Sequence, residues 1–245
     1  HFIEQSNGCH NNREKLGVYQ LHAKNAADKN ENAGVYIKLY DTDYFTHRIM
    51  RAVYYELRDE GHAISKLQNE NLREINTYNY FTTSLGINLY LIMDSANGED
   101  IIFSQRAAHA AHEESRFKYN STVMEGVSQS DFDYAITSHK EISLWKSAER
   151  GLEEELGVTT DEIKIWLHDF FLQKDFFEIG VTASAKLTED MATFEEYMRD
   201  LPAKDKDLEV ARLVPVPFTT NKISQFICKH DMYEQGLYTL RMVAA

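Results

Sequence analysis

Apolar and polar residues alternate in two short stretches near the start of the chain, and this alternation predicts β-strands. Residues 33–40, AGVYIKLY, place Val35, Ile37 and Leu39 on one face of an extended segment. Residues 16–23, LGVYQLHA, form a similar apolar island within a polar region that is rich in Asn and Lys. We therefore expect two strands before residue 41.

The segment that follows, residues 41–61, changes to helical spacing. Its predicted buried stripe consists of Phe45, Ile49, Val53 and Leu57. Thr42 or Asp43 is placed to cap the start of this helix, and Gly61 is placed to end it. We expect His47 and Arg48 to lie on the surface rather than to bind a ligand. Residues 1–83 are accordingly predicted to form a small α+β module.

From residue 84 onward the pattern predicts a larger domain, residues 84–245, built on a sheet. GINLYLIM (86–93) and IIFSQR (101–106) are predicted to pair as a hairpin that turns at Asn97-Gly98. NSTVMEG (120–126) is a short strand that ends in Gly126. Further strands are predicted at 163–171, 175–187 and 208–218, where Pro215 and Pro217 suit a sheet edge. Helices are predicted at 189–201, 221–230 and 232–243.

One more helix is predicted between the short strand and the strands that follow. Ser138 and Glu141 match a capping box, and Gly157 is placed to stop the helix. The predicted apolar stripe consists of Ile142, Trp145, Ala148, Leu152 and Leu156.

Three consecutive glutamates occupy the last turn of this predicted helix. Glu154 and Glu155 fall on the flank that also contains Ser147 and Gly151, whereas Glu153 points elsewhere. Neighbouring carboxylates repel each other unless a positive charge joins them, and Mg²⁺ prefers such oxygen ligands. Spacing alone leaves two interpretations, a solvated acidic helix face and a metal site.

Residues 148–158, AERGLEEELGV, resemble the second half of the Nudix box, Gx5Ex7REUxEExGU, in which U is a bulky aliphatic residue. The matching positions are Arg150, Leu152, Glu154, Glu155, Gly157 and Val158. The order of the flanking elements is also similar, and the resemblance covers roughly residues 84–245. It implies an α+β protein with a Nudix-like α/β/α sandwich and a mixed sheet, preceded here by the small N-terminal module.

The chain departs from the Nudix pattern in two ways. Counting back from Arg150 puts the family's Gly and first Glu at Ile136 and Ile142, which do not match. Gly126 is the alternative counterpart of that Gly, and the loop before the helix is then ten residues longer. Gly151 stands where typical members have a glutamate that binds metal or helps to activate water.

A third carboxylate would then have to come from elsewhere in the chain. Glu178 is the first choice, and Glu209 precedes the last predicted strand. The loop that leads to the helix offers Glu141 or His139. The cluster His109, His112, Glu113 and Glu114 also has metal-like spacing, although an exposed polar loop gives the same pattern by accident.

The resemblance implies Mg²⁺- or Mn²⁺-dependent hydrolysis of a nucleoside-diphosphate-linked substrate. The implied metal ligands are Glu154, Glu155 and Glu178, and Arg150 joins the first two as a catalytic residue. The candidate substrate-binding residues are Arg106, Glu125 and Gly126. For Arg106 and Arg150, phosphate contact and structural pairing remain equally open.

Two other classes of function stay open. Nudix-like domains can lose hydrolysis and bind an ADP-ribose-like ligand as sensors, and both Gly151 and the extra N-terminal module favour this alternative. The glutamates could also cluster by coincidence in a scaffold protein. Isopentenyl-diphosphate isomerases share the longer loop, but their catalytic Cys would fall at residues 122–124, where there is none.

The net charge and the composition limit the classes of partner that the protein can bind. The formal net charge of -13 offers no electrostatic surface for nucleic acid or an anionic membrane, so we expect neither, and a nucleotide-derived small molecule would be received through metal ions. Two cysteines without metal spacing favour a reducing, cytoplasmic location, and no apolar run is long enough for a membrane span.

The N-terminal strands offer a surface for a homodimer. Because the chain begins at His1 rather than Met, we expect the natural N-terminus to lie upstream.

Overall fold

The computed structural model describes residues 12–24, 34–66, 72–96, 98–108, 115–133, 141–158, 163–190 and 210–245. The chain divides into two compact units. Unit 1 comprises His1–Leu85, Gly126–Asp131 and Leu172–Gly180. Unit 2 comprises Gly86–Glu125, Phe132–Phe171 and Val181–Ala245. No helix within the described ranges is long and apolar enough to cross a membrane.

Unit 1 contains the two strands and the helix expected near the N-terminus. β1 (Glu14–Lys24) pairs antiparallel with β2 (Gly34–Asp43), and α2 (Tyr44–Asp59) follows directly. Asp43 is the N-cap, because its side chain accepts a hydrogen bond from the backbone N–H of Thr46. The unit also contains α3 (Leu72–Thr77) and short 3-10 helices at 63–66, 79–81 and 129–131.

The buried face of α2 is not the aliphatic stripe that the spacing predicted. Ile49 and Val53 are 52% and 37% exposed, whereas His47, Arg51 and Tyr54 are buried. The rings of His47 and Tyr54 and the long side chain of Arg51 bury apolar surface, while the polar atoms at their ends form hydrogen bonds. The Arg51 guanidinium lies 4.0 Å from the centre of an aromatic ring, that of Phe176. Tyr54 joins a hydrophobic cluster that contains Ile64 and the aromatic rings of Tyr78, Phe81 and Phe177.

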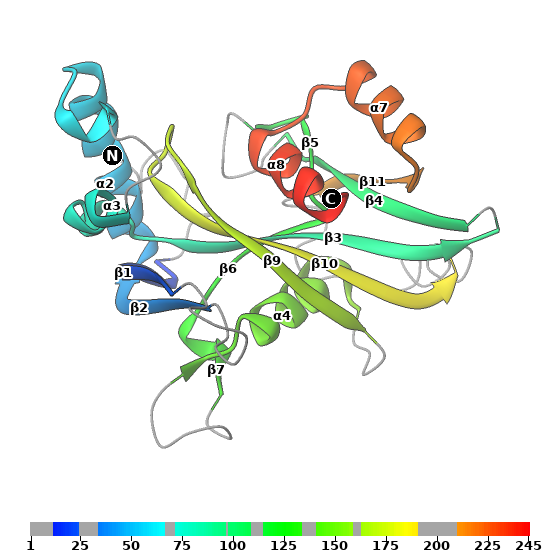
Figure 1. The fold of residues 1–245 in the computed structure, drawn as a ribbon, viewed down its shortest axis with the longest axis horizontal. Coiled ribbons are helices and arrows are strands. Elements are labelled where there is room, and N and C mark those ends of the chain that lie inside the picture. Colours follow the sequence, from blue (N-terminus) through cyan, green and yellow to red (C-terminus); the bar gives the residue numbers. More distant parts are fainter. Residues whose placement is uncertain are drawn as a thin grey trace. The chain divides into compact units, whose positions relative to one another are not determined.

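Unit 2 is built on a sheet that has seven strands among the described residues, in the order β11-β4-β3-β10-β9, with β5 on β4 and β6 on β3. The bounds are β3 Leu85–Ser95, β4 Gly98–Arg106, β5 Tyr119–Asn120, β6 Val123–Gly126, β9 Lys164–Gln173, β10 Glu178–Asp190 and β11 Val210–Pro217. β4 is antiparallel to both β3 and β11, whereas β3 and β10 run the same way in Figure 1, so the sheet is mixed. β11 carries Pro215 and Pro217 at the sheet edge, as expected.

Helices cover both faces of this sheet, which confirms the expected α/β/α arrangement. α7 (Thr220–Lys229) and α8 (Glu234–Val243) lie on one side of the strands and α4 (Leu144–Leu156) on the other (Figure 1). The core under α7 and α8 is formed by Tyr90, Ile92, Ile101, Phe103, Tyr119, Val216, Ile223, Phe226 and Leu240. The predicted helix at 189–201 lies outside the described residues, except that residues 189 and 190 end β10.

The chain crosses from β4 to β3 between β5 and β6, and buried polar residues fix this crossing. Ser104 donates to the carbonyl oxygen of Ser121. The hydroxyl of Thr122 accepts from the backbone N–H of Leu91 at 2.8 Å and donates to the carbonyl oxygen of Ile102. All of these side chains are 1% exposed or less. The start of β6 is therefore held rigidly against the middle of the sheet.

We predict that unit 1 loses stability as the pH falls below 6.5, because of His47. Burial lowers the pKa of His47 from 6.5 to about 4, although the nearby Glu178 raises it in part. The folded state therefore holds a neutral imidazole, whose Nδ1 lies 3.0 Å from the hydroxyl oxygen of Thr83. Between pH 6.5 and pH 4 the unfolded chain takes up the proton first, so about 2 kcal/mol should be lost by pH 5.

Urea unfolding at pH 7.5 and pH 5 measures this loss. His47→Asn keeps a polar atom near the position of Nδ1 but does not titrate, so its stability should change less between the two pH values. An equal pH dependence in the variant and the original protein would contradict the assignment.

Candidate functional site

α4 begins later than the sequence predicted. Ser143 is its N-cap and accepts from the backbone N–H of Lys146 at 3.3 Å. Glu141 and Ile142 instead form β8, which pairs antiparallel with β7 (Phe132–Asp133). Their backbone groups therefore bond to a strand rather than within a helix. The proposed cap Ser138 lies outside the described residues. Gly157 ends the helix in the left-handed conformation with φ 71°, as expected.

The apolar side of α4 is shorter than the predicted stripe. Ala148, Leu152 and Leu156 are buried, but Trp145 is 52% exposed and Ile142 belongs to β8. The helix therefore packs through its middle and C-terminal turns, the part that carries the glutamates.

The three glutamates differ in their surroundings as the helical spacing predicted. Glu153 is exposed and Glu154 is half-buried. Glu155 is only 5% exposed, on the same buried flank as Ser147 and Gly151. Its Oε1 accepts from the backbone N–H of Met124 in β6 at 3.1 Å, which fixes the orientation of this carboxylate.

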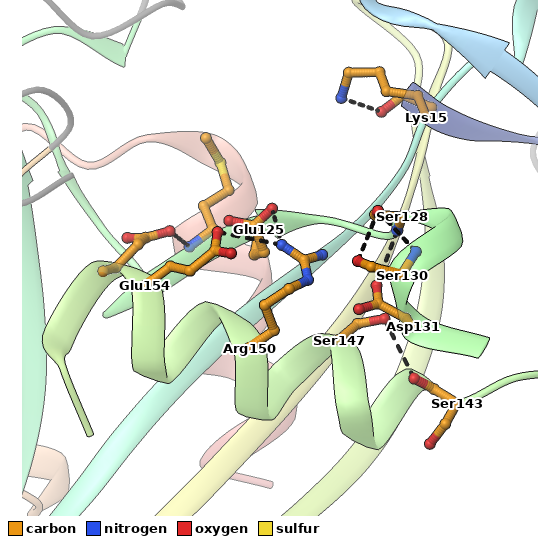
Figure 2. A network of polar contacts seen from close by, with 12 residues as sticks. Lys15, Glu125, Ser128, Ser130, Asp131, Ser143, Ser147, Arg150 and Glu154 are labelled. Atoms are coloured by element: carbon orange, nitrogen blue, oxygen red, sulfur yellow. Dashed lines mark hydrogen bonds and ion pairs between the residues drawn. The ribbon is translucent and has the colours of Figure 1, made fainter. Parts of the chain in front are cut away.

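Arg150 joins two carboxylates that come from different elements. Its Nη1 lies 2.9 Å from Oε1 of Glu125 and 3.4 Å from Oε2 of Glu154, as Figure 2 shows. Glu125 stands near the end of β6, and Glu154 lies one helical turn after Arg150. The side chains of Glu125 and Glu154 remain 23% and 32% exposed. The structure thus places Glu125 beside the box helix, a contact that spacing along the sequence does not reveal.

The glycine at position 151 has a packing cause. A Cβ atom there would lie 2.8 Å from Cγ1 of Val123 and 2.9 Å from Cβ of Glu125. Contacts this short do not occur between real side chains, so α4 can approach β6 this closely only without a side chain at position 151. Typical Nudix boxes have a glutamate at this position. The space that its side chain would enter is occupied here by the side chain of Glu125.

The remaining predicted residues fall into three groups. Arg106 ends β4 with its side chain 1% exposed, which favours structural pairing over phosphate contact. Gly126 and Glu178 belong to unit 1. A Cβ atom on Gly126 would lie 3.3 Å from Nζ of Lys15, and Glu178 acts electrostatically on His47. The residues that lie outside the described ranges are His109, His112, Glu113, Glu114, His139 and Glu209.

The carboxylates around Arg150 are not arranged as a metal site. Within the described ranges, no three His, Cys, Asp or Glu side chains are grouped so that they could hold a metal ion. The contacts above give the reason. The Arg150 guanidinium bonds to both Glu125 and Glu154, and Glu155 is turned to the backbone of β6.

The chain is similar in fold to several solved structures with which it shares little sequence. No family model and no curated protein matches the chain. Among solved structures, the chain is similar to an Ap4A hydrolase from C. elegans, with 15% identity, a TM-score of 0.40 and coverage of 66% of this chain and 95% of that one. It is also similar to the Nudix domain of NrtR from Shewanella oneidensis, whose structure contains ADP ribose (11% identity, TM-score 0.37, coverage 65% and 84%).

A MutT/Nudix family protein from Listeria innocua is similar at 17% identity, with a TM-score of 0.39 and coverage of 65% of this chain and 90% of that one. Two of these three structures, those from Shewanella oneidensis and Listeria innocua, are named as Nudix proteins. This likeness concerns the fold alone.

We predict that Gly151→Ala destabilises unit 2 by about 1–3 kcal/mol through overpacking against β6. The new methyl group would meet Val123 and Glu125, and this cost exceeds the gain of up to about 1 kcal/mol from replacing a helical glycine with alanine. Glu153→Ala is the matched control, because it changes an exposed position of the same helix. Thermal unfolding measures both variants, and a Gly151→Ala protein as stable as the original would refute the packing explanation.

Proposed function

We propose that this protein hydrolyses a diphosphate linkage in a nucleotide-derived substrate with the help of Mg²⁺ or Mn²⁺. The observation that carries the proposal is the convergence of Glu125 and Glu154 on one guanidinium nitrogen, beside the buried Glu155. Carboxylates from two rigid elements that meet at a solvent-accessible point provide the ligands that such cations prefer. The resemblance of residues 148–158 to the Nudix box supports the same chemistry.

In this proposal Glu154 and Glu155 bind the cation. A bound divalent cation would neutralise the diphosphate and lower the pKa of a coordinated water. The Met124 N–H holds one oxygen of Glu155 and thereby sets the direction of the carboxylate. Arg150 has the planar fork that binds a phosphate group with two parallel hydrogen bonds, so in this proposal it would orient the substrate.

A second function, nucleotide binding without hydrolysis, is favoured by one specific observation. Position 151 has no carboxylate and no room for one, and Arg150 already balances part of the charge of Glu125 and Glu154. If the cation does not enter, the same surface would recognise an ADP-ribose-like diphosphate mainly through Arg150. The protein would then act as a sensor or regulatory module.

The two functions are separated by one assay. The protein is incubated with Mg²⁺ or Mn²⁺ and with ADP-ribose, nucleotide sugars, dinucleoside polyphosphates and nucleoside triphosphates, and the products are separated by chromatography. We expect cation-dependent turnover of at least one substrate. Glu154→Gln should lower kcat about a hundredfold, because it removes cation binding that is worth several kcal/mol in the transition state. Glu153→Gln, on the exposed side of α4, should change kcat less than about twofold.

Two results would count against the proposal. Tight binding of one compound without turnover of any would establish the sensor function instead. Full turnover by a Glu154→Gln, Glu155→Gln double variant would show that the reaction takes place elsewhere.

A further inference from the structure

One edge of the β1–β2 hairpin in unit 1 is covered by side chains of the same unit. The backbone N–H and C=O of Leu21 both bond to the side-chain amide of Asn76, at 2.9 and 3.0 Å. Val18 donates its N–H to the carbonyl oxygen of Thr82 at 2.8 Å, and its own carbonyl accepts from the Thr82 hydroxyl. The outer edge of β1 is therefore closed to a further strand.

The opposite edge of the hairpin is formed by β2, which pairs with no described strand other than β1. Val18 is paired with Leu39 and turns both of its backbone groups away from β2. The same holds for Leu21, which is paired with Ile37. In such non-hydrogen-bonded pairs both members turn outward, so Leu39 and Ile37 also point away from β1. By strand alternation, the outward backbone groups of β2 belong to Val35, Ile37, Leu39 and Asp41.

Two further observations agree with an open edge at β2. The N–H of Tyr44, one residue beyond the strand, bonds to the carbonyl oxygen of Arg13, so the even-numbered residues of β2 face β1. Val35 and Tyr36 are 44% and 61% exposed, so the beginning of β2 is open to solvent. A row of outward donors and acceptors on an open edge is the feature to which an added strand binds.

The distribution of charge favours a second copy of this chain as the added strand. Residues 12–60, which contain the hairpin and α2, include eight Lys or Arg and eight Asp or Glu residues, so their formal charges cancel. The whole chain has a formal net charge of -13. Two copies therefore repel each other least when they meet through this N-terminal segment.

β2 is also complementary to itself in one antiparallel register, the one centred on Leu39. Lys38 then lies opposite Tyr40 of the second copy, and no two like charges face each other along the strand. Tyr36 lies opposite Thr42 of the second copy. A register centred on Lys38 would instead place two lysines directly opposite each other, which is destabilising.

We propose that β2 pairs antiparallel with β2 of a second copy in the register centred on Leu39, so that two hairpins form one four-stranded sheet in a homodimer. A two-stranded ribbon is marginally stable in water, and the added strands would strengthen it. Strand pairing alone buries little surface, so we expect a Kd in the micromolar range. The inference concerns unit 1 and does not depend on the proposed hydrolysis.

Sedimentation velocity of the complete protein at increasing concentrations gives the Kd of the dimer. Leu39→Pro removes an outward N–H at the centre of the new pair and leaves the bonds to β1 in place. We expect its Kd to rise at least about tenfold, because each dimer loses two hydrogen bonds. Ile49→Glu is the control, because it changes a side chain of α2 that is 52% exposed and should shift the Kd less than about twofold.

Two results of this experiment would overturn the inference. One is an original protein that stays monomeric at millimolar concentration. The other is a dimer that Ile49→Glu dissociates and Leu39→Pro does not, because the exposed face of α2 would then be the interface.

Disulfide formation tests the register even if Leu39→Pro fails to fold, because it leaves every backbone bond in place. Cys9 and Cys228 are first replaced with Ser. A mixture of Tyr36→Cys and Thr42→Cys proteins should form a mixed disulfide, since the two positions are a non-hydrogen-bonded pair with Cα atoms about 4.5 Å apart. Neither variant should crosslink alone, because equal positions lie about 20 Å apart. Self-crosslinking of either variant, or no mixed disulfide, would refute the proposed pairing.

Discussion

The close approach of α4 to β6 at Gly151 is the contact on which the candidate site depends. Without a Cβ at this position the helix lies directly against the side chains of Val123 and Glu125. The same approach lets the Glu155 carboxylate reach the backbone of β6, and it brings Arg150 to Glu125. A single missing side chain therefore determines which acids meet and which is buried.

Much of the fold follows from local patterns in the sequence. The strands of the hairpin around Gly98, the short strand that ends at Gly126 and the two terminal helices all have clear periodicity or turn residues. They form where the pattern predicts them because each element buries the face that its own sequence marks as apolar. The edge position of the strand with Pro215 and Pro217 follows in the same way from the missing backbone donors.

The sequence-based predictions are wrong where a contact with a residue distant in sequence has more effect than the local pattern. α2 turns His47 and Tyr54 inward because Thr83 and an aromatic cluster receive them, and neither partner is close in sequence. Residues 141–142 pair as a strand although they continue a helical stripe, because residues 132–133 offer a backbone partner. For the site, the helical spacing separated Glu153 from Glu154 and Glu155, since that depends on α4 alone. It could not reveal that Glu125 meets Arg150, which requires the fold of unit 2.

The departures from the Nudix pattern have a common physical interpretation. Glu125 on β6 takes up the space beside position 151, so no carboxylate can stand on α4 at that position. The acids that meet Arg150 therefore come from two elements, Glu125 from β6 and Glu154 from α4. Arg150 carries one positive charge against the two carboxylates of Glu125 and Glu154, and Glu155 is held separately by the backbone N–H of Met124. Glu125 and Glu154 stay partly exposed, so solvent screens the negative charge that Arg150 does not balance.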